Sequence, residues 1–182
     1  MKKTTLLTAL VLCMVMVFSL DAQAQKFSKM DVSPMDAAAY PSSYREANKM
    51  MKVVYSRPQL KGRDLSNLVP NGEVWRTGAN EATELILYTD MKLGGTNIKA
   101  GTYSLFAIPG EKEWTIIVSK DVNVWGAYSY DQANDVARLN VPVGSGSKSL
   151  EAFSISLDDG DDNGIDMHMG WGTMRLTVPF TN

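Results

Sequence analysis

Short runs that alternate apolar and polar residues recur along this 182-residue chain from Met51 onward, most of them ended by Gly, Pro or Asn. In the run TELILYTD, residues 83–90, Leu85 and Leu87 share one side and the residues between them take the other. A period of two places apolar side chains on one face of a β-strand, whereas a helix needs a period near 3.6. No long helical pattern accompanies these runs, so the sequence predicts an all-β domain.

The runs predict about eight strands, with turn residues roughly every 8–12 positions. They lie at residues 52–56, 83–90, 102–108, 113–119, 135–143, 151–157, 165–169 and 173–180. Gly94-Gly95 predicts one hairpin turn, Pro109-Gly110 a second, and Gly170–Gly172 a third between the last two strands. The Gly- and Ser-rich stretch 144–149 predicts a loop. We expect an antiparallel β-sandwich, with a partly closed β-barrel as the alternative.

At most short helical turns are expected, and Asp64–Leu68 is the best candidate, with Asp64 as its N-cap. Residues 25–49 contain two prolines and no sustained period, so they predict an N-terminal arm with at most one short edge strand. Residues 50–182 then form a single β-sandwich domain, which is an ordinary size for one domain.

The first 24 residues have the pattern of a secretory signal peptide. Lys2 and Lys3 precede an apolar run from Leu6 to Leu20, and Ala22-Gln23-Ala24 has the A-x-A form of a cleavage site. The run is shorter than the roughly 20 residues that a membrane-spanning helix needs. We therefore expect an exported protein, periplasmic or extracellular, with no membrane span in the mature chain.

The mature chain is poor in reactive side chains. Cys13 is the only cysteine and lies in the predicted signal peptide, while His168 is the only histidine. Disulfides, a thiol nucleophile and a multi-histidine zinc site are therefore excluded. Removing Lys2, Lys3 and Asp21 from 18 basic and 20 acidic residues leaves 16 and 19, a net charge of −3. This mild acidity argues against a nucleic-acid partner.

The stretch WRTGANEAT, residues 75–83, is unusually rich in large and polar side chains for a turn. Trp75 could cover one end of the core while Arg76, Asn80 and Glu81 form an internal hydrogen-bonded set. In the other interpretation Arg76 clamps an anion or carboxylate and Asn80 and Glu81 orient a ligand. Both interpretations stay open. The internal one requires that Arg76 and Glu81 be paired, because a charged Arg or Glu is rarely buried without a partner.

Residues 120–134 predict a long loop that carries Trp125, Tyr128 and Tyr130. Long loops without secondary structure are often binding elements, and these rings could stack on a sugar or an apolar ligand. Alternatively, the rings pack beneath the loop as a satellite cluster. The spacing of the aromatic residues does not decide between the two.

Asp159, Asp161 and Asn163 match the first half of a calcium-binding loop, D-x-D-x-N-G. Position twelve of such a loop would be Gly170, where a bidentate Glu is required, and the flanking helices are absent from the sequence pattern. The favoured interpretation is a solvated acidic hairpin loop, with calcium as the minor alternative. No other cofactor is expected.

Catalytic options are few. A Ser/His/Asp triad would have to use His168, but the chain has no G-x-S-x-G elbow, and a surface or half-buried histidine is the favoured interpretation. Four carboxylates qualify by type alone as acid–base pairs. These are Glu81, Glu84, Asp135 and Glu151.

Four segments, in order, resemble the family catalogued as domain of unknown function 2911. They are YSRPQLKGR (55–63), LVPNGEVWRTGANEAT (68–83), AGTYSLFAIPGEKEW (100–114) and WGAYSYDQANDVARLNV (125–141). The resemblance spans roughly residues 33 to 180. It implies a β-rich fold and export, and proteins of this family occur widely in Bacteroidetes. It implies no activity, cofactor or catalytic residue.

Three functional hypotheses follow. The leading one is a non-catalytic exported β-sandwich that binds a small ligand, a glycan or a partner protein through the loops around Trp75–Glu81 and Trp125–Tyr130. The second is a hydrolase or isomerase that uses carboxylates, with Arg76 as an electrophilic clamp. The third is a structural module of the cell envelope, in which WRTGANEAT only supports the fold.

Overall fold

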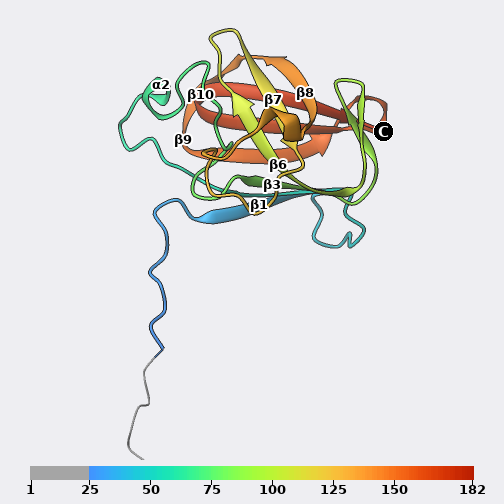
Figure 1. Cartoon of the computed structure of the whole chain (residues 1–182). Coiled ribbons are helices and arrows are strands. Elements are labelled where there is room, and N and C mark those ends of the chain that lie inside the picture. The colour runs from blue at the N-terminus through green and yellow to red at the C-terminus, as the bar shows by residue number, and fades with distance from the viewer. Residues whose placement is uncertain (1–24) are drawn as a thin grey trace, which may run out of the picture. The chain divides into compact units, whose positions relative to one another are not determined.

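The computed structural model describes residues 25–182, and residues 31–182 form one compact unit. The predicted signal peptide lies outside the described residues. Two antiparallel β-sheets face each other across a shared core and do not close into a barrel (Figure 1). The predicted β-sandwich is therefore confirmed, and the barrel alternative is not adopted.

The larger sheet has six strands in the order β1-β2-β3-β6-β7-β8. Their bounds are β1 (Met35–Tyr40), β2 (Met51–Ser56), β3 (Thr83–Leu87), β6 (Gly101–Ile108), β7 (Glu113–Ser119) and β8 (Asp135–Pro142). The edge strand β1 lies within the range 25–49 and pairs with β2 over its whole length.

The smaller sheet has the order β5-β4-β10-β9. Its strands are β4 (Met91–Leu93), β5 (Thr96–Ile98), β9 (Gly144–Asp159) and β10 (Ile165–Thr181). Gly94 and Gly95, both with positive φ, make the tight turn between β4 and β5 that the sequence predicts. Within residues 25–182 there are also three short helical elements: α2 (Leu65–Leu68), η1 (Gln132–Asn134) and η2 (Asp161–Asn163). Asp64 precedes α2, but its side chain makes no capping hydrogen bond.

β10 is continuous in sequence but doubles back near Gly172. Nine extended residues would span roughly 30 Å, yet Nδ1 of His168 lies 3.0 Å from Oγ1 of Thr177. The amide of Asn182 donates to the carbonyl of Asn163 at 2.8 Å, which fits the same cross-strand register. Gly172 has a φ of 56°, so it supplies the left-handed conformation that such a turn requires. The predicted hairpin between residues 165–169 and 173–180 is thus present.

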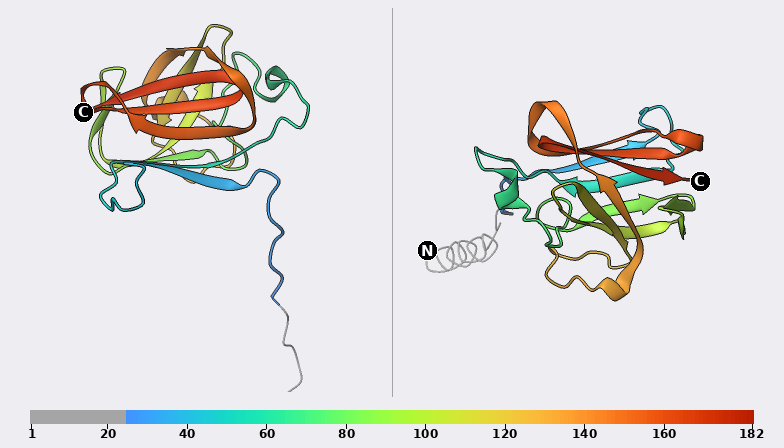
Figure 2. Two further views of the ribbon diagram at one scale, coloured as in Figure 1. Left: turned by 180° about the vertical axis from the view of Figure 1, so that it is seen from behind. Right: turned by 90° about the horizontal axis from the view of Figure 1, so that it is seen from above.

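The Gly- and Ser-rich stretch 144–149 is part of β9, so the predicted loop there is wrong. Gly144 and Ser145 pair with Arg175 and Met174 of β10, and the segment wraps around the tip of the β10 hairpin (Figure 2). Arg175 holds this wrap, because its guanidinium donates to the carbonyl of Lys148 at 2.6 Å. Small side chains allow the bend, and backbone pairing supplies the strand character that composition alone does not reveal.

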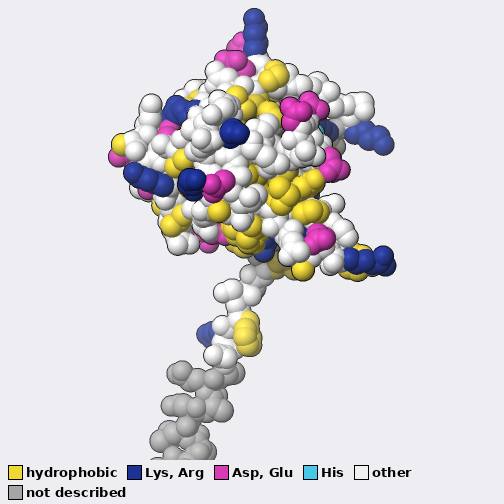
Figure 3. All heavy atoms as spheres, turned by 90° about the vertical axis from the view of Figure 1, so that its right-hand side faces the viewer, with side chains coloured by type: hydrophobic (Ala, Val, Ile, Leu, Met, Phe, Trp, Pro, Cys, Tyr) yellow, Lys and Arg dark blue, Asp and Glu magenta, His cyan; other side chains and the backbone are white. Residues whose placement is uncertain are grey.

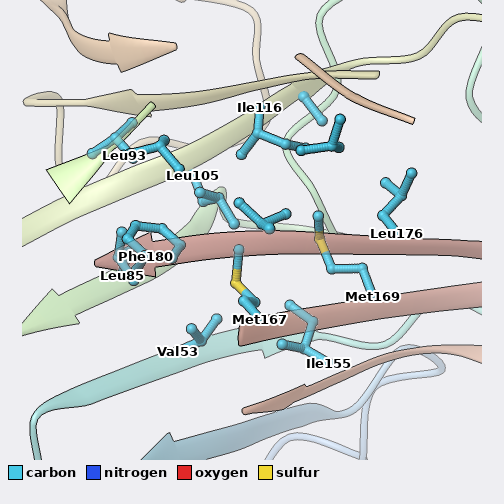
Figure 4. Packing of buried hydrophobic residues seen from close by; sticks show 14 of the residues in the cluster. Val53, Leu85, Leu93, Leu105, Ile116, Ile155, Met167, Met169, Leu176 and Phe180 are labelled. Carbon is cyan, nitrogen blue, oxygen red and sulfur yellow. The ribbon is translucent and has the colours of Figure 1, made fainter. Parts of the chain in front are cut away.

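The core lies between the two sheets and follows the period-two patterns of their strands. In β3, Leu85 and Leu87 are buried on the core face, as their alternation predicts. Both arms of β10 send every second side chain into the same space, including Met167 and Met169. Figure 4 shows these apolar side chains from both sheets filling the space between them. Burial of this surface is the main stabilising term in a domain without disulfides.

Side chains also connect the two sheets along the edge formed by β1 and β9. Arg57 pairs with Asp36 at 2.9 Å and donates to the carbonyl of Phe153 at 3.0 Å. Tyr40 of β1 donates a hydrogen bond to Asp159 of β9. These side-chain contacts hold the edge strands β1 and β9 together, but no backbone ladder joins the two strands to close the sandwich into a barrel.

Surface charge is mixed. On the side seen in Figure 3, acidic and basic side chains are scattered among small apolar patches, and no field of one sign dominates. This distribution agrees with the near balance of acidic and basic residues in the sequence.

Candidate functional site

The two loops that the sequence analysis singled out are joined by backbone hydrogen bonds. Ala82 donates to the carbonyl of Val124 at 2.9 Å, and Gly126 donates to the carbonyl of Asn80 at 3.0 Å. The two bonds flank an antiparallel bridge between Glu81 and Trp125. We call this pairing the 81–125 bridge. It makes residues 75–83 and 122–130 one continuous surface.

The 81–125 bridge brings two site residues into contact range. Because its hydrogen bonds flank the pair instead of joining it, Glu81 and Trp125 form the closer type of antiparallel pair, with adjacent side chains. Both side chains face solvent, and Trp125 is 59% exposed. The Trp125 ring is thus presented outward and is not packed beneath the loop.

Trp75 has the opposite placement. Its side chain is 9% exposed, its ring stacks on Trp171 at 5.9 Å, and it meets Phe153 edge-on at 5.0 Å. Its backbone also pairs with Ala107 of β6 through two hydrogen bonds of 2.7 and 2.9 Å. Trp75 therefore anchors the loop to the core, and through this anchor it fixes the position of the next residue, Arg76.

Arg76 is half-buried, and its Nη1 donates to the carbonyl of Asn80 at 3.2 Å. No ion pair within residues 25–182 involves Arg76, so it does not hold Glu81, and its bond to the Asn80 carbonyl is a backbone contact of the kind that the internal hydrogen-bonded set allows. A guanidinium has five N–H donors, which leaves most of them available. Arg76 lines a pocket of about 240 Å³, which we call the Arg76 pocket. Its other lining residues are Glu73, Val74, Trp75, Ala127 and Tyr128.

Tyr128 forms the outer wall of the Arg76 pocket and is 84% exposed. Gly126 lies between Tyr128 and Arg76 and has a φ of 70°. A β-carbon at Gly126 would lie 2.6 Å from the Tyr128 ring and 3.2 Å from Nη1 of Arg76. Only glycine allows both side chains to approach the loop backbone so closely, because it combines the left-handed φ with the absence of a side chain.

The backbone of the turn after Arg76 is strained. Thr77 has a φ of 53°, which is rare for a β-branched residue, and its buried hydroxyl has no hydrogen-bond partner among residues 25–182. Its carbonyl is held by the hydroxyl of Thr83 at 2.6 Å. Asn80 also has a positive φ, which asparagine tolerates better. The surrounding structure thus holds this turn in a conformation that the residues alone disfavour.

Tyr130 belongs to the structural support of the loop. Its ring meets Phe106 edge-on at 5.2 Å on the outer face of the larger sheet. Its hydroxyl donates to Asp135 at 2.9 Å and accepts from Arg138, and these two residues form an ion pair at 2.5 Å. Burial, followed by the Asp135 carboxylate, raises the pKa of Tyr130 to about 12. Of the predicted loop aromatics, Tyr130 therefore packs inward, while Trp125 and Tyr128 face outward.

This arrangement predicts an alkaline dependence of stability. The pKa of Tyr130 is raised from 10.0 to about 12 in the folded protein. Protonated Tyr130 therefore contributes fully to the free energy of unfolding below pH 10, and this contribution is lost as the pH rises toward 12. We expect the free energy of unfolding, measured by urea titration, to fall less steeply across this range in Tyr130→Phe than in the wild type. Tyr128→Phe, which alters an exposed ring, should keep the wild-type dependence. The same slope in both variants would contradict this assignment.

The acidic segment that matches the first half of a calcium-binding loop forms the turn between β9 and β10. Asp159 accepts a hydrogen bond from Tyr40, and the carbonyl of Asn163 accepts one from Asn182. Asp161 is exposed in η2. Among residues 25–182 no group of three or more His, Cys, Asp or Glu side chains is arranged to hold a metal ion.

His168 lies on the outer face of the smaller sheet. Its Nδ1 is 3.0 Å from the Thr177 hydroxyl, and its Nε2 is 3.8 Å from Asp158. Within the described part of the chain no hydrogen bond joins His168 to a serine, and the hydroxyl beside its ring is that of Thr177.

A second pocket, of about 250 Å³, lies on the other side of the 81–125 bridge and includes Glu81 and Glu84. Ser104 also lines it, and this residue is not among those that the sequence pattern indicates. The available signal was a serine on the solvent-facing side of an otherwise apolar strand. The remaining carboxylate candidates lie elsewhere: Asp135 is paired with Arg138, and Glu151 accepts from the backbone of Lys61 at 2.7 Å.

A protein-family model with the description "Protein of unknown function (DUF2911)" matches residues 33–180 of the chain. No curated protein and no solved structure matches it. None of the helices within residues 25–182 is both long enough and apolar enough to cross a membrane.

Proposed function

The chain belongs to the DUF2911 family of proteins of unknown function, and on that premise we propose that it is an exported, non-catalytic binding domain for a carboxylate-bearing glycan. The ligand carboxylate occupies the Arg76 pocket, and the sugar rings pack on Tyr128 and Trp125. The signal-peptide pattern of residues 1–24 supports export, where such a ligand would be met.

The observation that carries this proposal is the state of Arg76. Its guanidinium is half-buried in a pocket and hydrogen-bonded to one backbone carbonyl, and it has no carboxylate partner within the described residues. A planar guanidinium matches a carboxylate through two parallel hydrogen bonds, and such charge-assisted bonds are stronger than neutral ones. Glu73 also lines the pocket but forms no ion pair with Arg76, so the guanidinium is available to pair with a carboxylate of a ligand.

The aromatic residues indicate a ring-shaped ligand. Trp125 and Tyr128 are held three positions apart on a loop whose backbone is fixed by the 81–125 bridge, and both expose most of their surface. Exposed aromatic rings supply large, rigid contact areas, and the apolar C–H face of a pyranose packs well against them.

The size of the Arg76 pocket also supports a glycan. At about 240 Å³ it is smaller than the roughly 300–1,000 Å³ of pockets that enclose a whole small molecule. It would hold one acidic unit of a longer ligand, and the neighbouring units would lie across the loop surface.

The test uses isothermal titration calorimetry with trigalacturonate and with its fully methyl-esterified form as the neutral probe. We expect the wild type to bind the acid and not the ester. Arg76→Gln should weaken binding of the acid about 10- to 100-fold, because it removes a charge-assisted pair. Arg45→Gln, at an exposed position outside the pocket, should bind like the wild type.

Two results would contradict the proposal. One is equal binding of the acid and the ester, which would show that the carboxylate is not recognised. The other is wild-type affinity in a folded Arg76→Gln variant. Chromatography of the recovered trigalacturonate tests the non-catalytic part separately, since any shortened product would indicate hydrolysis.

A further inference from the structure

The second pocket is built by three neighbouring strands and the two joined loops. Val54, Glu84 and Ser104 lie side by side across β2, β3 and β6, because their backbones are in direct register. Their side chains therefore share the outer face of the larger sheet. The loops add Glu81 and Val122 to the pocket, and Met35 contributes from the start of β1. We call this space the Glu84 pocket.

The charge of the Glu84 pocket is negative. Glu81 and Glu84 are its only charged lining residues, and neither forms an ion pair within residues 25–182.

Ser104 is the second and independent observation. Its side chain lies on the pocket side of β6, the residue is only 2% exposed, and its hydroxyl has no hydrogen-bond partner in the described part of the chain. Thr77 is the only described residue with a fully buried, unpartnered side-chain oxygen, so the Ser104 hydroxyl opens onto the pocket and must take its hydrogen-bond partner there, from water or from a polar group of a ligand.

We propose that the Glu84 pocket binds a primary ammonium group carried on an alkyl stem, such as the end of a diamine or a lysine side chain. The ammonium has three donors and no acceptor. Glu84, Ser104 and Glu81 offer acceptors to it, while Val54, Met35 and Val122 provide apolar contacts for the stem.

The acceptor set favours an organic cation over a metal ion. Two glutamates and one serine hydroxyl give fewer oxygen ligands than calcium usually takes, and residues 25–182 hold no group of three acidic, His or Cys side chains arranged for a metal. The apolar walls would also contribute nothing to a hydrated ion, whereas they match an alkyl chain. The Glu84 pocket does not include Arg76, so this site does not depend on the glycan proposal.

The experiment measures binding of cadaverine by isothermal titration calorimetry, with 1,5-pentanediol as the uncharged probe of the same length. We expect cadaverine to bind and the diol not to bind. Glu84→Gln should weaken cadaverine binding about tenfold or more, and Ser104→Ala should weaken it by a smaller factor. Glu111→Gln, an exposed change outside the pocket, should have no effect.

Thermal unfolding of each variant shows whether it is folded. If Glu84→Gln does not fold, Ser104→Ala still tests the pocket. Arg76→Gln should bind cadaverine normally, and Glu84→Gln should bind trigalacturonate normally, which separates this proposal from the previous one. The proposal is overturned by absence of cadaverine binding to the wild type, by equal binding of the diol, or by wild-type affinity in both pocket variants.

Discussion

Replacing Trp75 by alanine is expected to lower the free energy of unfolding by about 3–5 kcal/mol. The ring is almost completely buried and touches three other aromatic rings, with Trp171 stacked on it and Phe153 and Trp114 edge-on. Its removal leaves a cavity that rigid neighbours cannot fill, so the lost contacts add to the lost burial. Urea unfolding followed by far-ultraviolet circular dichroism measures the change.

Trp125→Ala is the matched control, because it removes the same ring from the other half of the candidate site. Trp125 is largely exposed, so its loss should change the free energy of unfolding by no more than about 0.5 kcal/mol while weakening the binding of trigalacturonate. Equal destabilisation by the two replacements would show that Trp125 supports the fold and would remove it from the proposed binding surface.

Gly164→Ala is expected to destabilise the protein by about 1–3 kcal/mol or more. A β-carbon at this position would overlap the carbonyl oxygen of Phe180 and lie 2.8 Å from that of Asp161. Both obstacles are backbone atoms, one in η2 of the β9–β10 turn and one in the second arm of β10, so neither can move without disturbing the fold. Thermal and urea unfolding should both report the loss.

Gly144→Ala provides the comparison within the same sheet. A β-carbon there would meet its nearest atom, the carbonyl of Arg175, at an ordinary 3.4 Å, and Gly144 does not have a positive φ. This replacement should be neutral, or stabilising by up to about 1 kcal/mol through the unfolded state. If both variants were equally stable, close packing would not explain the glycine in the D-x-D-x-N-G motif.

The local part of the fold could be predicted from the sequence. The alternation in β3 identifies its core face, and Gly94-Gly95 and Gly170–Gly172 identify two hairpin turns. These signals work because both the side-chain period and the turn conformation are set by neighbouring residues. The stretch 144–149 was predicted wrongly because its strand character depends on pairing with residues some 30 positions away.

The sequence indicates which two segments form the candidate site, but it does not indicate how their side chains are arranged. WRTGANEAT and the Trp125 loop were identified by composition, yet their direct pairing joins residues that are far apart in the sequence. The roles within the site were also hidden. Periodicity could not show that Trp75 faces the core, that Arg76 bonds to the carbonyl of Asn80, or that Ser104 lies beneath a loop.

The 81–125 bridge also has a consequence for the order of folding. The chain between its two ends contains β3 through β7, so pairing of these strands shortens the loop that the bridge has to close. Contacts of such long sequence separation form late, because the entropy of closing the intervening loop must first be offset by other structure. The chain would therefore acquire the Arg76 and Glu84 pockets late in folding, and ligand capture would be restricted to folded molecules.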